Sequence, residues 1–453
     1  MNYDSKAWNK SNVFFIGWNR ELDKNIQSIA NSTISARYGV QPSEPVYLVN
    51  GAFNCCYKVR VKDFDVLFRF PILGKSAFRY EKTNDEAAIM AYISQHTTIP
   101  TPKVIRVTAS AMGPYIVMEF VEGTLLLTHL EAPSLDRTAP PVLNPNISIP
   151  VITKSYRHMA HILIELSKCR FTQIGGVIRD ESKHWRVGKR PMTINMNHLV
   201  SFANFPPTAL PEQSFTTANE YFSALAEIHM THLRTQRNDA AEDDKDYQKK
   251  YIARCLFRRI ARSFSTTYNH GPFPLYCDDL GPGNLIVDDD LDVKSTIDWE
   301  YCYAAPAELT YCSPWWLLLS RPTIWEEELS SFLEQYIPRH QLFLGVLREY
   351  EDERIADGLL SECQRLSDSM AQSLSNGNFW FCIAVTSSFI FDDVYWQFID
   401  PIYYGKFTSI EDRIALLSSD EQKDLEPFVR LKAEQAREGR LDDHRTLDEL
   451  LTA

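Results

Sequence analysis

The chain has 453 residues, of which 44% are hydrophobic and 23% are charged, so collagen-like, coiled-coil and wholly disordered proteins are excluded. Its 47 Lys and Arg residues against 59 Asp and Glu residues leave a net charge of −12, which disfavours general binding to nucleic acid or to an anionic membrane. The nine cysteines are scattered and form no Cys-x-x-Cys pair, which predicts reduced thiols and a cytoplasmic location. The longest apolar segment, residues 379–391, is shorter than the roughly 20 residues of a membrane span, and we expect it to form one buried helix.

The predicted elements begin after residue 40, because residues 1–40 show no strand periodicity and are expected to form a helical or irregular extension. Apolar residues at helical spacing between Asn84 and Gln95 predict one helix, which Pro100 and Pro102 would end. Strand-forming runs surround this helix and predict a β-β-β-α-β-β lobe over residues 41–122. These runs are Tyr47–Val49, Cys55–Val61, Val66–Phe70, Lys103–Val107 and Tyr115–Phe120.

The remainder of the chain is predicted to be mainly helical. Residues 123–150 are rich in proline and indicate a linker, residues 151–418 form a helical lobe, and residues 419–453 form a charged helical tail. The charged run Gln236–Asp246 has no apolar face and is expected to be a mobile loop.

The most informative residues are an Asp and an Asn five positions apart, Asp279 and Asn284, with turn-forming residues between them. A short apolar strand follows, and a second strand ends at Asp298. Phosphoryl transfer from ATP needs these oxygens: one carboxylate orients the attacking hydroxyl, while an Asn and a second carboxylate hold Mg²⁺. A simple turn would explain the loop alone, but Asp298 at the matching distance favours the catalytic hypothesis.

The segment Cys277-Asp278-Asp279-Leu280-Gly281-Pro282-Gly283-Asn284, with Ile297-Asp298-Trp299-Glu300 after it, resembles the catalytic loop of the aminoglycoside phosphotransferase / choline kinase-like family. The wider pattern, with Gly-Ala-Phe-Asn at 51–54 and Ile174-Gly175 after a helix, resembles the fungal members of this family. That family follows His-Gly-Asp-Leu-His-Pro-x-Asn and then Ile-Asp-Trp/Phe-Glu. The resemblance implies that Asp279 is the catalytic Asp and that Asn284 and Asp298 bind Mg²⁺. Cys277 and Gly281 depart from the pattern, because each takes the place of a His. In the family, the first His helps to brace the loop.

The N-terminal half would supply the nucleotide site. A kinase-like lobe needs a hairpin over the phosphates, and residues Asn50, Gly51, Ala52 and Phe53 join the first two strands where such a hairpin turn belongs. An ordinary hairpin turn would explain these four residues equally well.

A kinase-like lobe also needs a cation on its third strand and a helical Glu that orients this cation. Arg69 is the candidate cation, because an Arg keeps the charge of the usual Lys and can grip phosphate oxygens, and Lys58 is its rival. Glu86 is the expected partner of Arg69, with Glu81 as the weaker alternative.

The strand Tyr115–Phe120 would lead into the hinge between the lobes. In a kinase-like lobe the adenine meets this backbone, so we expect Met118 behind the base and Glu119 and Val121 beside it. The same strand also fits a plain core strand, which is compatible with this role.

The acceptor would lie against the C-terminal helices, where family members often hold an ammonium group with acids and aromatic residues. Glu300, Asp392, Asp393 and Trp396 are the candidates for this role. A capping or packing role for the last three is the alternative.

Together these features predict a bilobal α+β, protein-kinase-like fold, with a small antiparallel-sheet N-lobe and a large, mainly helical C-lobe. The predicted function is an ATP- and Mg²⁺-dependent phosphotransferase that moves the γ-phosphate to a hydroxyl of a small-molecule acceptor. No nucleic acid, membrane or obligate protein partner is inferred. The alternative is a catalytically weak or inactive kinase-like nucleotide-binding or scaffold protein, which Cys277 in place of His and Arg69 in place of Lys favour.

Overall fold

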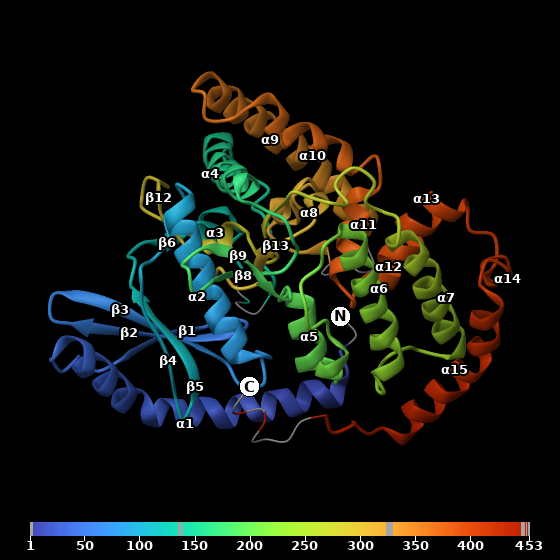
Figure 1. Ribbon diagram of the computed structural model, residues 1–453, viewed down its shortest axis with the longest axis horizontal. Coiled ribbons are helices and arrows are strands. Elements are labelled where there is room, and N and C mark those ends of the chain that lie inside the picture. Colours follow the sequence, from blue (N-terminus) through green and yellow to red (C-terminus); the bar gives the residue numbers. More distant parts are fainter. Residues whose placement is uncertain are drawn as a thin grey trace.

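A five-stranded antiparallel sheet with the strand order β1-β2-β3-β5-β4 builds the first lobe in the computed structural model (Figure 1). The model describes residues 3–134, 136, 139–322, 329–444, 449 and 451. The strands are β1 (Val46–Asn50), β2 (Asn54–Val61), β3 (Phe64–Pro71), β4 (Val104–Ser110) and β5 (Gly113–Glu119). The predicted meander and the two later strands are therefore confirmed.

Helix α1 (Ser5–Tyr38) covers one face of this sheet. Its buried residues Leu22, Ile26 and Ile34 pack in one apolar cluster with residues of β2, β3 and β5. In Figure 1 the helix runs as a long dark-blue rod along the sheet. The expected extension is thus helical from Ser5 to Tyr38, and this helix forms one layer of the N-lobe core.

Alternation along β3 separates the two faces of the sheet. Val66, Phe68 and Phe70 point toward α1, so Arg69, between the last two, points to the opposite face. That face is covered by α2 (Arg79–His96), which begins five residues before the predicted start at Asn84. Arg69 is thereby buried between the sheet and α2, on the side of the second lobe.

The lobes are joined through β6 (Thr124–Leu125), which pairs with β11 (Leu285–Val287), the first strand of the hairpin that carries the predicted catalytic residues. Gly123 precedes β6 with φ +151°, and a Cβ atom there would lie 2.5 Å from the Val287 carbonyl oxygen. Only glycine fits this close approach without strain. Part of the predicted linker is therefore ordered as a third strand against this hairpin.

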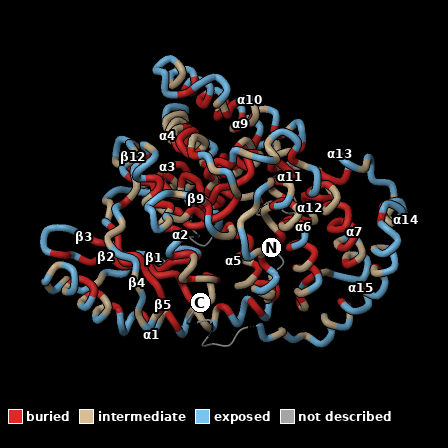
Figure 2. Tube along the Cα trace, viewed as in Figure 1, coloured by how far each residue is buried: buried red, intermediate tan, exposed pale blue. Residues whose placement is uncertain are grey.

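The second lobe is mainly helical, as predicted, and its buried residues form one large cluster (Figure 2, red). The bilobal α+β, protein-kinase-like architecture is thus confirmed. Its helices are α3 (Leu126–Leu130), α4 (Ile149–Lys168), α5 (Ile194–Phe202), α6 (Ala218–Thr235), α7 (Asp244–Ala261), α8 (Ala307–Thr310), α9 (Leu329–Ala356), α10 (Ser367–Ser373), α11 (Asn378–Thr386), α12 (Phe391–Val394), α13 (Asp400–Tyr404), α14 (Ile410–Ile414) and α15 (Ser419–Glu438). Its strands are β7 (Arg170–Phe171), β8 (Gly176–Arg179), β9 (Trp185–Lys189), β10 (Phe273–Cys277), β11 (Leu285–Val287), β12 (Val293–Thr296) and β13 (Cys302–Ala304).

Two expectations for this lobe were wrong. The segment 379–391 is not one helix, because α11 ends at Thr386 and Ser388 uses its backbone N–H and its hydroxyl to bond to Asn195 of α5. The run Gln236–Asp246 is not a free loop either. Asn238 bonds to the buried carboxylate of Asp4 at 3.0 Å, and α7 already begins at Asp244.

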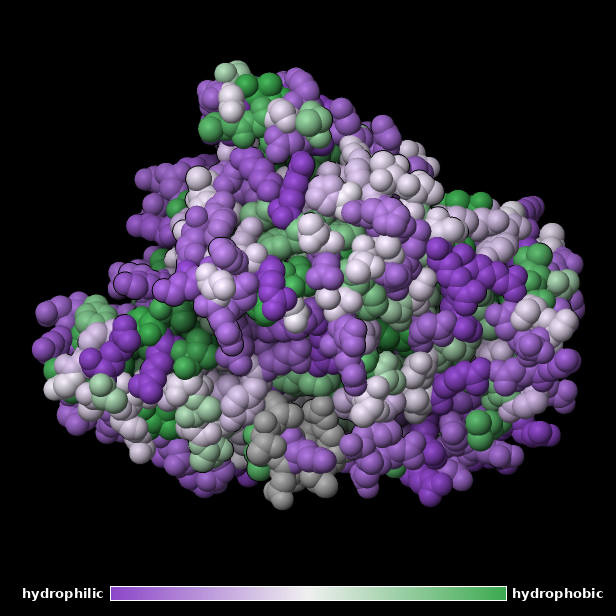
Figure 3. All heavy atoms as spheres, viewed as in Figure 1, coloured by the Kyte–Doolittle hydropathy of each residue, from purple (hydrophilic) through white to green (hydrophobic). Residues whose placement is uncertain are grey.

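The face drawn in Figure 3 is mostly hydrophilic, with separate hydrophobic patches. Among the residues described, no helix combines the length and the apolar character that crossing a membrane requires.

Candidate active site

The catalytic segment forms a tight hairpin at the junction of the lobes. After β10 the chain turns through residues 278–281 into a short 3₁₀ turn, Pro282–Asn284, and then into β11 and β12. The Asn284 side-chain oxygen accepts from the Gly281 N–H at 2.8 Å, and the Asn284 carbonyl accepts from the Ile297 N–H at 2.8 Å. The hairpin thus brings Asn284 beside the end of β12, where Asp298 follows.

Asp298 sits in an unusual backbone conformation. Its φ is +63°, which a non-glycine residue rarely adopts and which recurs at functional sites. The next residue, Trp299, is fully buried and donates through Nε1 to the Thr296 carbonyl at 3.0 Å, so it anchors this turn. Burial raises the pKa of Asp298 to about 7, against the pull of Arg69, and neighbouring carboxylates add to the rise.

Arg69 of β3 bridges the lobes. Its Nε lies 3.2 Å from Glu86 of α2, and its Nη2 donates to the Asp298 carboxylate. Glu86 is buried, and desolvation raises its pKa while Arg69 opposes that rise. The expected pairing of Arg69 with Glu86 is present, and it holds the cation directly against the predicted metal ligand.

The two rival residues lie elsewhere. Lys58 pairs with Asp65 at 2.8 Å on the sheet, and Glu81 pairs with Arg190 at 2.7 Å. The structure therefore brings Arg69 and Glu86, but neither Lys58 nor Glu81, to the catalytic hairpin.

A second buried cation, Lys82, completes this interlobe network. Its ammonium lies 2.5 Å from Glu300, and both side chains are 1% exposed. Asn54 at the start of β2 donates to the same carboxylate at 3.0 Å and accepts from Lys82 at 3.2 Å. Sequence reasoning missed Lys82, because the predicted helix began after it. The sequence held no signal for Lys82, because the burial of Glu300, which calls for a second cation, is visible only in the structure.

Asp279 carries an ion pair of its own. Arg321 donates through Nη2 to the Asp279 carboxylate at 2.9 Å and to the Asp278 carbonyl at 2.6 Å. Burial raises the pKa of Asp279, and the Arg321 charge opposes that rise. Arg321 was not predicted, and no sequence pattern connects it to the loop, 42 positions away.

The departures from the family pattern at Cys277 and Gly281 have local structural counterparts, and so does Asp278, which takes the place of the Gly. The Cys277 thiol donates to the Glu300 carbonyl at 3.7 Å, while the buried Asp278 carboxylate accepts from the Ile194 N–H at 3.0 Å. Burial raises the pKa of Asp278 to about 6. At Gly281, a Cβ atom would lie 3.5 Å from Trp316 and 3.6 Å from Trp315, so two indoles fill the space beside the loop.

The predicted nucleotide residues lie on the N-lobe side. Gly51 and Ala52 are exposed at the tip of the β1–β2 hairpin, whereas Phe53 is buried and packs against Tyr301 at a ring distance of 5.7 Å. The side chain of Asn50 lies outside the described part of the structure. The loop tip is thus anchored to the second lobe by one aromatic residue.

The hinge segment follows the buried Met118 at the end of β5. The Glu119 N–H donates to the Lys103 carbonyl at 3.0 Å, so that donor is used within the lobe. Glu119 is exposed and Val121 is half-buried between the lobes.

The predicted acceptor residues are not gathered at the catalytic loop. Glu300 is buried and already bonded to Lys82 and Asn54, which corrects its assignment to the acceptor. Asp392, Asp393 and Trp396 line a separate pocket together with residues of α6 and α7, and Asp392 is bound by Arg254 at 2.6 and 3.0 Å. Sequence proximity to an apolar helix was an insufficient guide, because that helix ends at Thr386.

Comparison with known proteins adds the following findings. No protein-family model matches the chain, and no curated protein matches it. Its fold is similar to the aminoglycoside phosphotransferase APH(4)-Ia, with 13% identity over 88% of this chain and 97% of that chain, and a TM-score of 0.42. A putative fructosamine-3-kinase from Haemophilus somnus 129PT has 11% identity over 88% of this chain and 96% of that chain, and a TM-score of 0.42.

A third solved structure is spectinomycin phosphotransferase APH(9)-Ia in complex with ADP and spectinomycin. It shares 12% identity over 93% of this chain and 96% of that chain, with a TM-score of 0.35. These names fall in the group of proteins that the catalytic loop resembles. At such identities and TM-scores, the function has to be argued from the residues of the site.

Proposed function

We propose that the protein is an ATP- and Mg²⁺-dependent phosphotransferase that moves the γ-phosphate to a hydroxyl of a small-molecule acceptor. One observation carries the proposal. The hairpin sets Asn284 beside the turn that holds Asp298, Asp279 lies in the same loop, and the Arg69–Glu86 pair faces them from the N-lobe. Such a set of oxygens and one oriented cation is what phosphoryl transfer requires.

The residues present fit a divalent cation. Four carboxylates share this region with three basic side chains, which leaves a negative excess: Asp279, Asp298, Glu86 and Glu300 against Arg69, Lys82 and Arg321. Among the residues described, no three His, Cys, Asp or Glu side chains form a metal cluster. Asn284 and Asp298 would therefore hold Mg²⁺ together with phosphate oxygens, as is usual for this ion.

Each residue then has a defined task. Asp279 accepts the hydroxyl proton while the acceptor oxygen bonds to the γ-phosphorus and the bond to the ADP oxygen breaks. Arg69, oriented by Glu86, binds oxygens of the phosphates that are not transferred. Bound Mg²⁺ supplies neutralisation of the phosphate charge.

The test is thermal melting of the full chain with ATP and Mg²⁺. We expect both together to raise the melting temperature, Asp298→Asn to abolish the Mg²⁺-dependent part, and Asp279→Asn to retain it. Asp289→Asn is the matched control, because Asp289 is exposed at the far end of the same hairpin. Absence of any shift with ATP and Mg²⁺ in the wild type would overturn the proposal.

The scaffold alternative is favoured by one feature. Arg69 bonds to Asp298 and Arg321 bonds to Asp279, so both functional carboxylates are already paired. The two functions differ in turnover. If the protein is an enzyme, the wild type should release more ADP than Asp279→Asn when hydroxylated acceptors are screened. If it is a scaffold, it should bind ATP, and the two proteins should release equal amounts of ADP.

A further inference from the structure

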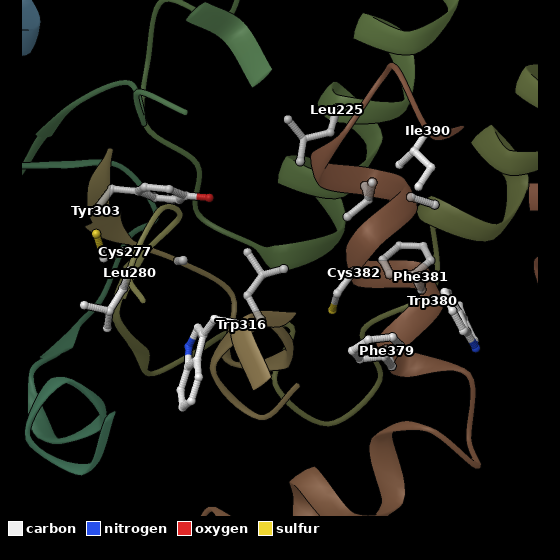
Figure 4. Close-up of a cluster of buried hydrophobic side chains, with 14 of the residues drawn as sticks. Leu225, Cys277, Leu280, Tyr303, Trp316, Phe379, Trp380, Phe381, Cys382 and Ile390 are labelled. Carbon is white, nitrogen blue, oxygen red and sulfur yellow. The ribbon is translucent and has the colours of Figure 1, made fainter. Parts of the chain in front are cut away.

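A second feature of the C-lobe is an apolar cavity beside the catalytic loop. Its wall is formed by Cys277 and Leu280, which flank Asp279, and by the indoles of Trp315 and Trp316. Phe379, Cys382 and Ile383 of α11 form the opposite wall. Figure 4 shows Trp316 between the loop residues Cys277 and Leu280 and the α11 residues Phe379 and Cys382.

Arg321 connects the cavity to Asp279, the proposed proton acceptor. This residue lines the cavity, its guanidinium lies 4.3 Å from the centre of the Trp315 ring, and its Nη2 contacts the Asp279 carboxylate. A molecule that fills the cavity therefore meets the group that touches Asp279. This position suits an acceptor whose hydroxyl reaches the loop.

The charges of the cavity wall limit what it can hold. No Asp or Glu is found among the described residues that line it, and Arg321 is their one permanently charged side chain. His198 also lines the cavity, but burial lowers its pKa to about 3, so its ring is neutral. An ammonium group there would lie near a guanidinium without a carboxylate of the wall to pair with, which is costly in an apolar site.

From these observations we infer that the acceptor is a largely apolar compound that bears a hydroxyl and no cationic group. This inference rests on the proposed phosphotransferase function and specifies its substrate class. The apolar body would lie between Trp316 and α11, with the hydroxyl directed to Asp279. An aminoglycoside or choline-like amine does not match this wall.

Asp392 and Asp393 of the C-lobe line a different pocket. The pocket that contains Asp392 and Asp393 is lined by residues between His232 and Arg254 and by residues between Ser388 and Gln397, whereas no lining residue of the apolar cavity lies beyond Ser387. Of these two pockets, only the second has carboxylates in its wall that could pair with a cationic compound. The two pockets therefore predict opposite preferences, which an experiment can separate.

The experiment measures binding and phosphorylation with two kinds of probe. A set of neutral aromatic and alicyclic alcohols, with 2-naphthaleneethanol as the first, represents the apolar class, and hygromycin B represents the polycations. Binding to the full chain is followed by calorimetry and tryptophan fluorescence, and phosphate transfer from ATP·Mg²⁺ is followed by ³¹P NMR. Ile383→Glu places a charge in the cavity wall, and Ile402→Glu is the matched control, because Ile402 is 55% exposed.

We expect at least one alcohol of the set to bind and to become phosphorylated, and Ile383→Glu to weaken its binding at least tenfold while Ile402→Glu leaves it unchanged. Ile383→Trp, which fills the cavity without a charge, serves if the Glu variant does not fold. The inference is wrong if no alcohol binds, or if hygromycin B binds and Ile383→Glu abolishes that binding. Failure of the proposed function is seen separately, as the absence of a melting shift with ATP·Mg²⁺ in the same preparations.

Discussion

The guanidinium of Arg321 holds the carboxylate of Asp279, with Nη2 2.9 Å from Oδ1. Arg321 is itself fixed over the Trp315 ring, so the pair links the catalytic loop to the wall of the apolar cavity. Because a nearby positive charge stabilises an ionised carboxylate, Arg321 keeps the pKa of Asp279 lower than burial alone would set it.

Removal of this charge should therefore move the pH profile of activity. In the proposed reaction Asp279 must be ionised to accept a proton, so activity should be lost as the pH falls through its pKa. In Arg321→Gln that pKa rises, and we expect the acidic limb of the rate profile to shift to higher pH. Arg440→Gln, at a 67% exposed side chain, is the control. An acidic limb that does not move in Arg321→Gln would show that the contact does not tune Asp279.

The raised pKa of Asp298 predicts a pH dependence of stability. The folded state holds the proton of Asp298 up to about pH 7, whereas the unfolded chain releases it near the ordinary value of 3.8. The stabilising contribution of this group is therefore fully present below the ordinary value and is lost as the pH rises through about 7. We expect the free energy of unfolding of the wild type to fall more between about pH 5 and about pH 8 than that of Asp298→Asn.

Urea unfolding at both pH values measures this difference, with Asp289→Asn as the control for the same chemical change. Equal pH dependence in the wild type and in Asp298→Asn would contradict the prediction. ATP·Mg²⁺ should act in the opposite sense, because bound Mg²⁺ favours the ionised carboxylate, so its binding should tighten as the pH rises through about 7.

The buried Lys82–Glu300 pair predicts a large effect on stability. Lys82→Met leaves the Glu300 carboxylate without its main partner in a site that is 1% exposed, and loss of one member of a buried pair costs roughly 3–5 kcal/mol. The double variant Lys82→Met/Glu300→Gln should recover much of this loss, because no unpaired charge remains.

Lys24→Met is the comparison for this pair. Lys24 pairs with Glu21 on the surface, with side chains 67% and 54% exposed, and such a pair contributes about 0–1 kcal/mol. Urea unfolding of the wild type, Lys82→Met, Lys82→Met/Glu300→Gln and Lys24→Met measures these differences in the free energy of unfolding. A Lys82→Met variant as stable as Lys24→Met would contradict the assigned role of the buried pair.

Because helix α1 is part of the N-lobe core, truncation of one of its buried side chains should destabilise the protein. Leu22 is fully buried against the sheet, so Leu22→Ala should lower the free energy of unfolding by about 2–5 kcal/mol. Val13 on the same helix is 69% exposed, and Val13→Ala should change it by less than about 0.5 kcal/mol. Equal effects in thermal unfolding would mean that α1 does not contribute to the core.

The N-lobe strands could be predicted because their signals are local. Alternation and turn residues determine β2 and β3, and the prediction erred only at element ends, as at α2, which begins at Arg79 instead of Asn84. The break after Thr386 could not be foreseen in the same way. Ser387 and Ser388 are compatible with a helix, and the bond between Ser388 and Asn195 joins residues 193 positions apart.

By itself, the sequence determined the chemical composition of the site: Asp279, Asn284 and Asp298 at a spacing that one hairpin brings together. Hairpin pairing and turn chemistry act over a few residues, so these relations are legible in the chain. Only the tertiary structure decided which charges meet. Arg69 reaches Asp298 across 229 positions and Asn54 reaches Glu300 across 246, because the packing of the two lobes brings those side chains together. Packing within the second lobe placed the indoles beside Gly281 and so determined the apolar character of the cavity next to the loop.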